Sequence, residues 1–155
     1  MTTQVNTERT ENPSETITIP SWFTAVAITA LIWNLLGVFA FALQMMITPE
    51  ILAGLPEAER ELYVNIPLWV TLAFAVAVFA GALGSLFLLM KKSLSTPLLI
   101  FSLVGILVQN FHSFFMSKAF EVHGPSGMIM PIAVIFLAIY LVLLSKKAEV
   151  QGWFS

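Results

Sequence analysis

The chain has 155 residues, a formal net charge of −2, 58% hydrophobic residues, 10% charged residues and a mean hydropathy of +0.89. This charge excludes nucleic acid as an expected partner, because nucleic-acid binding requires a basic surface. The chain also has no cysteine, which excludes disulfide bonds, thiolate nucleophiles and thiolate metal sites.

Four long segments of the chain contain no charged residue. A helix that crosses a lipid bilayer needs about 20 mostly apolar residues, and each of the four segments is long enough. Their apolar parts cover residues 22–47, 67–90, 96–117 and 128–145. The sequence therefore predicts an all-α, polytopic membrane protein built as a four-transmembrane-helix bundle.

Residues 1–20 precede the first predicted span. They contain three Glu and one Arg, are rich in Thr, Asn and Ser, and lack the positive start of a signal peptide. We therefore expect a solvated, disordered tail. The first apolar segment is too long for a signal peptide and should remain as a span.

The loop between the first two spans carries two helix-start signals. Thr48 suits an N-cap, Pro49 suits the first turn, and Glu50 suits the positive end of the helix dipole. A second start follows at Pro56 and Glu57. We expect a short helical outer loop, which serves either as a solvated connection or as a lid that gathers substrate.

The second span carries small residues at every fourth position. This spacing lets two helix backbones approach closely, and it predicts a helix-packing face. The partner helix can belong to the same chain or to another copy. The residues are Ala73, Ala77, Gly81 and Ser85.

The first and third spans each carry a stripe of polar residues. Within each span the polar residues share one side of the helix, within about 100° on the third span. Both spans cross the bilayer in the same direction, so Asn34 lies near the depth of Ser102, and Gln44 lies near the depth of His112. The two stripes should therefore face each other or a shared cavity. The candidate ligand-binding residues are Trp33, Asn34, Gln44, Gln109, His112 and Ser113.

Each of these polar residues has two interpretations. They can bind a neutral ligand, or they can hydrogen-bond across the spans and hold the helices together. His112 can also act as a proton sensor. Catalysis is disfavoured, because Ser85 and His112 differ in depth by more than about 10 Å, too far for a nucleophile and its base. We predict no catalytic residue and no cofactor.

A metal site is not expected either. The only two histidines, His112 and His123, lie about 16 Å apart along a continuous helix and cannot share one ion. The three or four ligands that a metal site requires are not available together.

The distribution of Lys and Arg predicts the orientation. Five of the seven lie in the tail, at the turn with Lys91 and Lys92, and after the last span, which favours cytoplasmic termini. We expect a multi-pass protein of the inner membrane, with residues 148–155 as a cytoplasmic C-terminal end.

Several stretches resemble a known group of proteins. The sequences IWNLLGVFAF, LPEAERELY, AFAVAVFAGALGSLFLLMKK and HSFF are similar to small bacterial four-span inner-membrane proteins that are commonly labelled as sugar transporters. In general shape the chain is also similar to DoxX-like four-helix membrane proteins. The first resemblance implies transport of a neutral solute such as a sugar.

Three functions remain open from the sequence. The first is a transporter or facilitator of a neutral solute, and the second is a non-catalytic assembly or accessory protein. The third is a membrane-embedded enzyme or sensor that uses His112. The expected partners are the lipid bilayer, a neutral small molecule and other copies of the chain, since four helices alone enclose little space. A ligand-sized cavity at the polar residues favours transport, whereas direct pairing of those residues favours assembly.

Overall fold

The computed structural model describes residues 17–155, and this part of the chain is helical with no strand. The prediction of a disordered tail therefore lies outside the described residues except at 17–20. The segments in chain order are α1 (Ser21–Met45), α2 (Pro49–Ala53), α3 (Glu57–Val64), α4 (Leu68–Leu89), α5 (Ser95–Phe111), the π-helical turn η1 (His112–Met116), α6 (Ala119–His123), the 3₁₀ turn η2 (Pro125–Met128) and α7 (Ile129–Val150).

Four helical stretches among the described residues are long and apolar enough to cross a membrane. They are Ser21–Met45, Leu68–Leu89, Ser95–Met116 and Pro125–Val150. The prediction of an all-α bundle with four membrane-spanning helices is therefore confirmed. The last helix continues beyond residue 145, because lysines at its end do not interrupt the backbone hydrogen bonds of a helix.

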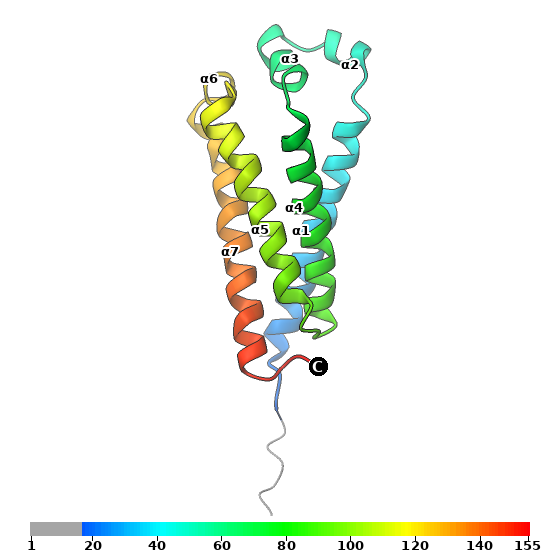
Figure 1. Cartoon of the computed structure of the whole chain (residues 1–155), viewed down its shortest axis with the longest axis vertical. Coiled ribbons are helices and arrows are strands. Elements are labelled where there is room, and N and C mark those ends of the chain that lie inside the picture. The colour runs from blue at the N-terminus through cyan, green and yellow to red at the C-terminus, as the bar shows by residue number, and fades with distance from the viewer. Residues whose placement is uncertain (1–16) are drawn as a thin grey trace, which may run out of the picture.

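The four long helices pack in the order α1, α4, α5, α7, with α4 and α5 at the centre of the arrangement. Figure 1 shows this order at its upper end, with α7 and α1 on the outside. We call this upper end, which holds α2, α3, η1 and α6, the loop end. We call the opposite end the base; it holds the start of α1, the α4–α5 turn and residue 155.

Helices α4 and α5 approach each other closely through glycines. A Cβ atom on Gly105 would lie 2.7 Å from the Ala73 carbonyl oxygen and 2.8 Å from the Ala77 nitrogen. A Cβ atom on Gly84 would lie 2.9 Å from the side chain of Leu99. These contacts are shorter than a real Cβ atom tolerates, so the backbones can meet only because glycine occupies both positions.

The buried core lies at the base and joins all four long helices. Phe23, Leu88 and Ala148 are fully buried there. The chain turns back after α7, so that the ring of Trp153 packs edge-on against Phe23 with centroids 5.2 Å apart. The backbone N–H of Ser155 then donates to the Lys91 carbonyl at 2.9 Å, which fastens this segment to the α4–α5 turn. The base is therefore closed.

The loop end confirms both predicted helix starts. The backbone N–H of Ile51 donates to the Thr48 hydroxyl at 3.4 Å, and Pro49 begins α2. Helix α3 begins at Glu57, directly after Pro56. A hydrogen bond with the Thr48 hydroxyl makes the largest contribution to lowering the pKa of Glu50 below its usual value. A hydrogen bond with the backbone N–H of Glu50 lowers it further.

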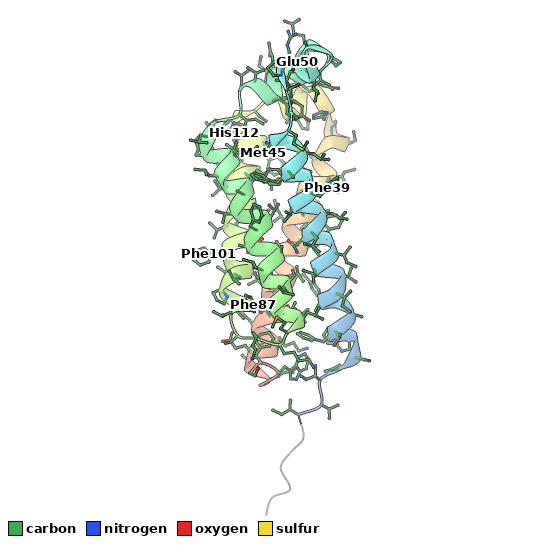
Figure 2. The ribbon with its side chains drawn as sticks, turned by 90° about the vertical axis from the view of Figure 1, so that its right-hand side faces the viewer. Phe39, Met45, Glu50, Phe87, Phe101 and His112 are labelled. Atoms are coloured by element: carbon green, nitrogen blue, oxygen red, sulfur yellow. The ribbon has the colours of Figure 1, made fainter. Side chains whose placement is uncertain are left out.

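The outer faces of the long helices are apolar, as a lipid-facing surface requires. Phe39 on α1 and Phe101 on α5 are each 61% exposed. They point away from the bundle on opposite sides in Figure 2. A membrane-spanning helix places such side chains against lipid tails.

Candidate functional site

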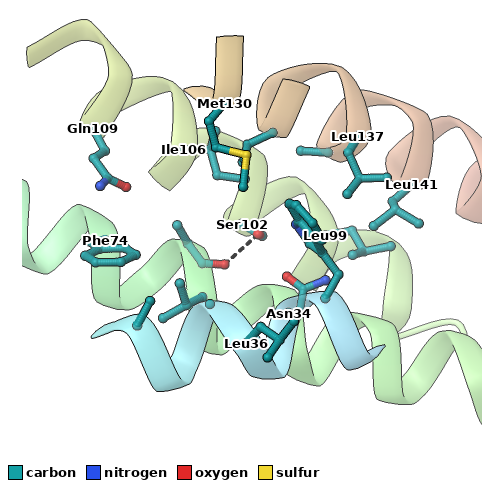
Figure 3. Close-up of a pocket in the computed structure, with 17 residues that line it drawn as sticks. Asn34, Leu36, Phe74, Leu99, Ser102, Ile106, Gln109, Met130, Leu137 and Leu141 are labelled. Atoms are coloured by element: carbon teal, nitrogen blue, oxygen red, sulfur yellow. Dashed lines mark hydrogen bonds between the residues drawn. The ribbon is translucent and has the colours of Figure 1, made fainter. Parts of the chain in front are cut away.

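A central cavity of about 410 Å³ lies between the four long helices. Figure 3 shows α1 with Asn34 and Leu36 on one side, α7 with Met130 and Leu137 on the other, and α4 and α5 between them. Of the predicted ligand-binding residues, the cavity is lined by Trp33, Asn34 and Gln109. The rest of its lining is almost entirely apolar: Leu36, Gly37, Ala40, Phe74, Ala77, Val78, Leu99, Ser102, Ile106, Met130, Val134, Leu137, Ala138 and Leu141.

Two polar side chains at the wall of the central cavity already have partners within the chain. The Asn34 amide donates to the Ala30 carbonyl at 2.8 Å and to the Ser85 hydroxyl at 3.0 Å. The Ser102 hydroxyl donates to the Ala77 carbonyl at 2.6 Å, which is the dashed line in Figure 3. These bonds tie α1 and α5 to α4. Asn34 and Ser102 therefore act as interhelical hydrogen-bonding residues.

Gly81 makes this arrangement possible. A Cβ atom there would collide with the Asn34 side-chain oxygen and would lie 2.9 Å from the Ser102 hydroxyl. The predicted packing stripe of α4 thus has neighbours on two helices of the same chain. Ala73 and Ala77 meet α5 at Gly105, whereas Gly81 and Ser85 receive Asn34 of α1.

A second, smaller cavity of about 130 Å³ holds the other predicted residues. We call it the polar pocket; it brings together Gln44 of α1, Gln109 of α5, and His112 and Ser113 of η1. The Ser113 hydroxyl donates to the Gln109 carbonyl at 3.2 Å. Within residues 17–155, however, the side chains of Gln44, Gln109 and His112 have no hydrogen-bond partner. Three polar groups without internal partners therefore converge on one pocket.

The π-helical turn η1 places His112 in this pocket. The α-helical pattern of α5 ends at Phe111, and the N–H of Ser117 donates to the His112 carbonyl at 2.8 Å, five residues back. His112 is only 9% exposed, and its ring lies edge-on to Trp69 with centroids 5.5 Å apart.

A third cavity of about 670 Å³, here called the vestibule, lies at the loop end. Glu59 and Glu61 of α3 line it together with Lys118 and Glu121 near α6. The vestibule shares Leu62, His112 and Ser117 with the polar pocket.

The polar pocket in turn shares lining residues with the central cavity. The shared residues are Phe74 and Gln109, and the Phe74 ring is held edge-on by Phe41 at 5.3 Å. The three cavities therefore follow one another from the loop end into the bundle, with His112 at the first junction and Gln109 at the second. At the base, the buried core ends this series.

Two arrangements were expected for the polar stripes of the first and third spans, a direct pairing or a shared cavity. Helix α4 lies between α1 and α5, so Asn34 bonds to Ser85 of α4 and to no residue of α5. Gln44 and His112 do line one pocket, but no hydrogen bond joins them. The two stripes thus share cavities and do not pair directly.

One polar cluster near the base was missed from the sequence. Ser145 of α7 donates to the Ser95 hydroxyl at 3.2 Å and lies 2.8 Å from the Thr96 hydroxyl. Thr96 also donates to the Glu149 carboxylate at 3.1 Å. In the sequence, the cluster corresponds to three hydroxyl residues near the base ends of the third and fourth spans. Such residues alone do not indicate which side chains they bond to. The cluster joins α5 to α7.

Within residues 17–155, no group of three or more His, Cys, Asp or Glu side chains is placed to hold a metal ion. Comparison with protein-family models, curated proteins and solved structures finds no match to this chain.

Proposed function

We propose that the protein binds a neutral small molecule within the membrane and carries it, as a transporter or facilitator. The observation that supports this proposal is the series of three neighbouring cavities that share lining residues. Unpartnered Gln44, Gln109 and His112 meet in the middle one. The central cavity also falls within the range of about 300–1,000 Å³ that small-molecule sites usually occupy.

Unpartnered polar groups inside a membrane protein favour a binding role over a packing role. A buried polar group without a hydrogen bond costs roughly 1–3 kcal/mol, so proteins usually satisfy such groups internally. The chain does this for Asn34 and Ser102, whereas the polar atoms of Gln109 and His112 remain accessible from the polar pocket and have no hydrogen-bond partner among residues 17–155. Water fills the polar pocket when no ligand is bound, and a ligand replaces that water with its own donors and acceptors.

The hydroxyls nearest to His112 argue for binding over catalysis. Ser113 donates to the Gln109 carbonyl, and Ser117 donates to the Ser113 carbonyl at 2.9 Å. A nucleophilic serine would direct its hydroxyl toward the histidine that removes its proton. Both hydroxyls are instead used by the backbone, so His112 serves better as a hydrogen-bonding group for a ligand.

Solute uptake by proteoliposomes tests the proposal. The purified protein is reconstituted and tested with a panel of radiolabelled neutral solutes that ranges from sugars to apolar alcohols. We expect at least one solute to enter faster than in empty liposomes, and His112→Ala to abolish this uptake. His123→Ala is the matched control, because His123 is exposed in α6 and lines none of the three cavities.

Thermal unfolding in detergent separates a functional loss from a folding defect. We expect His112→Ala to unfold within a few degrees of the unmodified protein, because no hydrogen bond of the imidazole is lost and the ring, apart from its edge contact with Trp69, borders the polar pocket and the vestibule. An unmodified protein that moves no solute of the panel would contradict transport and favour the accessory function. Loss of stability together with uptake would assign His112 to packing.

A further inference from the structure

We infer that the ligand is an uncharged, single-chain amphiphile. Its hydrocarbon tail lies in the central cavity and its headgroup lies in the polar pocket. This inference rests on the proposed function and specifies the class of solute. It follows from the lining, the length, the opening and the charge of the cavities.

The lining of the central cavity suits a hydrocarbon and not a sugar. The side chains with hydrogen-bonding groups in its lining are Trp33, Asn34, Ser102 and Gln109, and of these Asn34 and Ser102 already donate their hydrogen bonds within the chain. A sugar buried there would leave most of its hydroxyls without partners, at a cost for each one. A hydrocarbon tail needs no hydrogen-bond partner. Gln109, which is free, stands at the junction with the polar pocket, where a headgroup would begin.

The length of the central cavity matches a tail of moderate size. The cavity extends along α5 from Leu99 to Gln109, which is about 15 Å at the rise of an α-helix. An extended chain advances roughly 1.2 Å per bond, so this distance accommodates about twelve carbons.

The central cavity opens sideways toward the position of lipid. Leu36 of α1 and Met130 of α7 both line it, yet they are 59% and 58% exposed. The opening therefore lies between α1 and α7, the two outer helices of the arrangement. In a bilayer this opening faces hydrocarbon tails, so an amphiphile can enter with its tail already in an apolar environment.

The charges near the polar pocket select the headgroup. Gln44, Gln109 and His112 offer both hydrogen-bond donors and acceptors without a fixed charge. The adjoining vestibule carries three carboxylates, Glu59, Glu61 and Glu121, against the single ammonium group of Lys118. This excess of negative charge repels anionic headgroups such as a fatty-acid carboxylate. A glycerol-like headgroup with hydroxyls fits both features.

The experiment uses monoacylglycerols that carry a photoreactive diazirine near the end of the tail. The protein is reconstituted in nanodiscs with tails of eight, twelve and sixteen carbons at low mole fraction, and labelled residues are located by mass spectrometry. We expect the twelve-carbon probe to label residues of the central cavity most strongly, and excess unlabelled monolauroylglycerol to compete. Label that neither depends on chain length nor yields to competition would show nonspecific lipid contact and overturn the inference.

Two pairs of variants locate the tail and the headgroup. Val134→Trp fills the central cavity and should reduce the labelling about tenfold, whereas Ile132→Trp on the outer face of α7 should not. Gln109→Leu should also weaken labelling, whereas Val108→Leu at an exposed position should not. Equal labelling in all four variants would overturn the inference, as would photo-crosslinks that place a second copy of the chain in the opening.

The uptake assay keeps this inference separate from the proposed function. Glycerol and glucose carry a headgroup-like set of hydroxyls without a tail. If these solutes are taken up in a His112-dependent way while no monoacylglycerol competes, the proposed function stands and the amphiphile inference fails. If neither kind of compound is bound or moved, both fail.

Discussion

The two ends of the bundle are built in opposite ways. At the base, Phe23 and Leu88 are fully buried, and the hydroxyl cluster around Ser145 satisfies its own polar groups. At the loop end, the side chains of Gln44 and His112 have no hydrogen-bond partner among the described residues and line open cavities. Stability is therefore assigned to the base and the proposed binding site to the loop end of the same four helices, and the series of cavities ends at the buried core.

The comparison also extends to the two side-chain amides of the central cavity, which differ in their hydrogen bonding. Asn34 and Gln109 are both amides on the wall of the central cavity. Asn34 is bonded to its neighbours, whereas Gln109, about two turns closer to the loop end, is free. The change from paired to unpaired polar groups marks where packing ends and the site begins.

The largest expected effect comes from replacing a phenylalanine with alanine at the base, and the same replacement at the loop end serves as its comparison. Phe23→Ala removes a fully buried ring that packs on Trp153, and we expect a loss of about 3 kcal/mol in the free energy of unfolding. Phe115→Ala, at a side chain that is 75% exposed in η1, should cost less than about 0.5 kcal/mol. Unfolding by SDS in mixed micelles measures both. Similar losses would contradict the assignment of stability to the base.

A pair of glycine substitutions gives the next effect. Gly105→Ala places a Cβ atom against the backbone of α4 at Ala73 and Ala77, which cannot move aside as a side chain can, and should destabilise the protein by about 2 kcal/mol. Gly54→Ala, after α2, meets only ordinary contact with the Ile51 carbonyl at 3.5 Å and has a helical backbone conformation. We expect it to be neutral or stabilising by up to about 1 kcal/mol. Thermal unfolding in detergent distinguishes the two, and a Gly105→Ala protein as stable as the unmodified one would refute the close contact between α4 and α5.

The two amides of the central cavity sharpen the comparison further. Asn34→Leu leaves the Ser85 hydroxyl without its donor and should cost about 1 kcal/mol of stability. Gln109→Leu breaks no hydrogen bond of its side chain and should leave stability unchanged while weakening ligand binding. Denaturation in micelles and a binding assay on the same samples test this reversal. A stability loss for Gln109→Leu that equals the loss for Asn34→Leu would remove the distinction between paired and free amides.

The smallest effect concerns the loop between α1 and α4. Because the Thr48 hydroxyl lowers the pKa of Glu50, Thr48→Ala should raise that pKa toward its usual value. A carboxyl whose pKa is lowered by folding contributes stability above its unfolded pKa, and this contribution disappears as the pH falls through the folded pKa. The variant should therefore show a weaker acid-dependent loss of α2. NMR titration of the Glu50 side chain measures the shift, and an unchanged pKa would contradict the assigned hydrogen bond.

The spans could be predicted from the sequence because placing a charged residue inside a bilayer is costly, whatever the rest of the fold. Segments without charge predict helices directly, and Thr48 with Pro49 predicts a helix start by local hydrogen bonding. The prediction failed to place α4 between α1 and α5. These helices are apolar on almost every side, so periodicity does not indicate which faces meet, and contacts such as Gly105 on Ala73 depend on the pairing.

The candidate site was predictable as a set of residues but not as an arrangement. The polar residues were identified because they are rare in apolar segments, as Gln109 and His112 are. Their lack of internal partners could not be foreseen, since it depends on the π-helical turn η1 and on the neighbours that α4 supplies. The hydroxyl cluster of Ser95, Thr96 and Ser145 was missed because serine and threonine also occur unremarkably within membrane helices.

The contact between Phe23 and Trp153 has a consequence for how the molecule is made. It joins the beginning of the first span to the segment after the last, so it has one of the largest sequence separations that the described chain allows. Nearly every other contact of the bundle can form before it, as successive helices enter the bilayer. Until residue 153 is in place, the ring of Phe23 is surrounded by lipid. An aromatic ring without its protein partner is energetically more favourable at the membrane interface than in water. A contact between such distant parts of the sequence, of the kind that slows the folding of soluble domains, is therefore less hazardous here, because the early helices expose little that water would drive to aggregate.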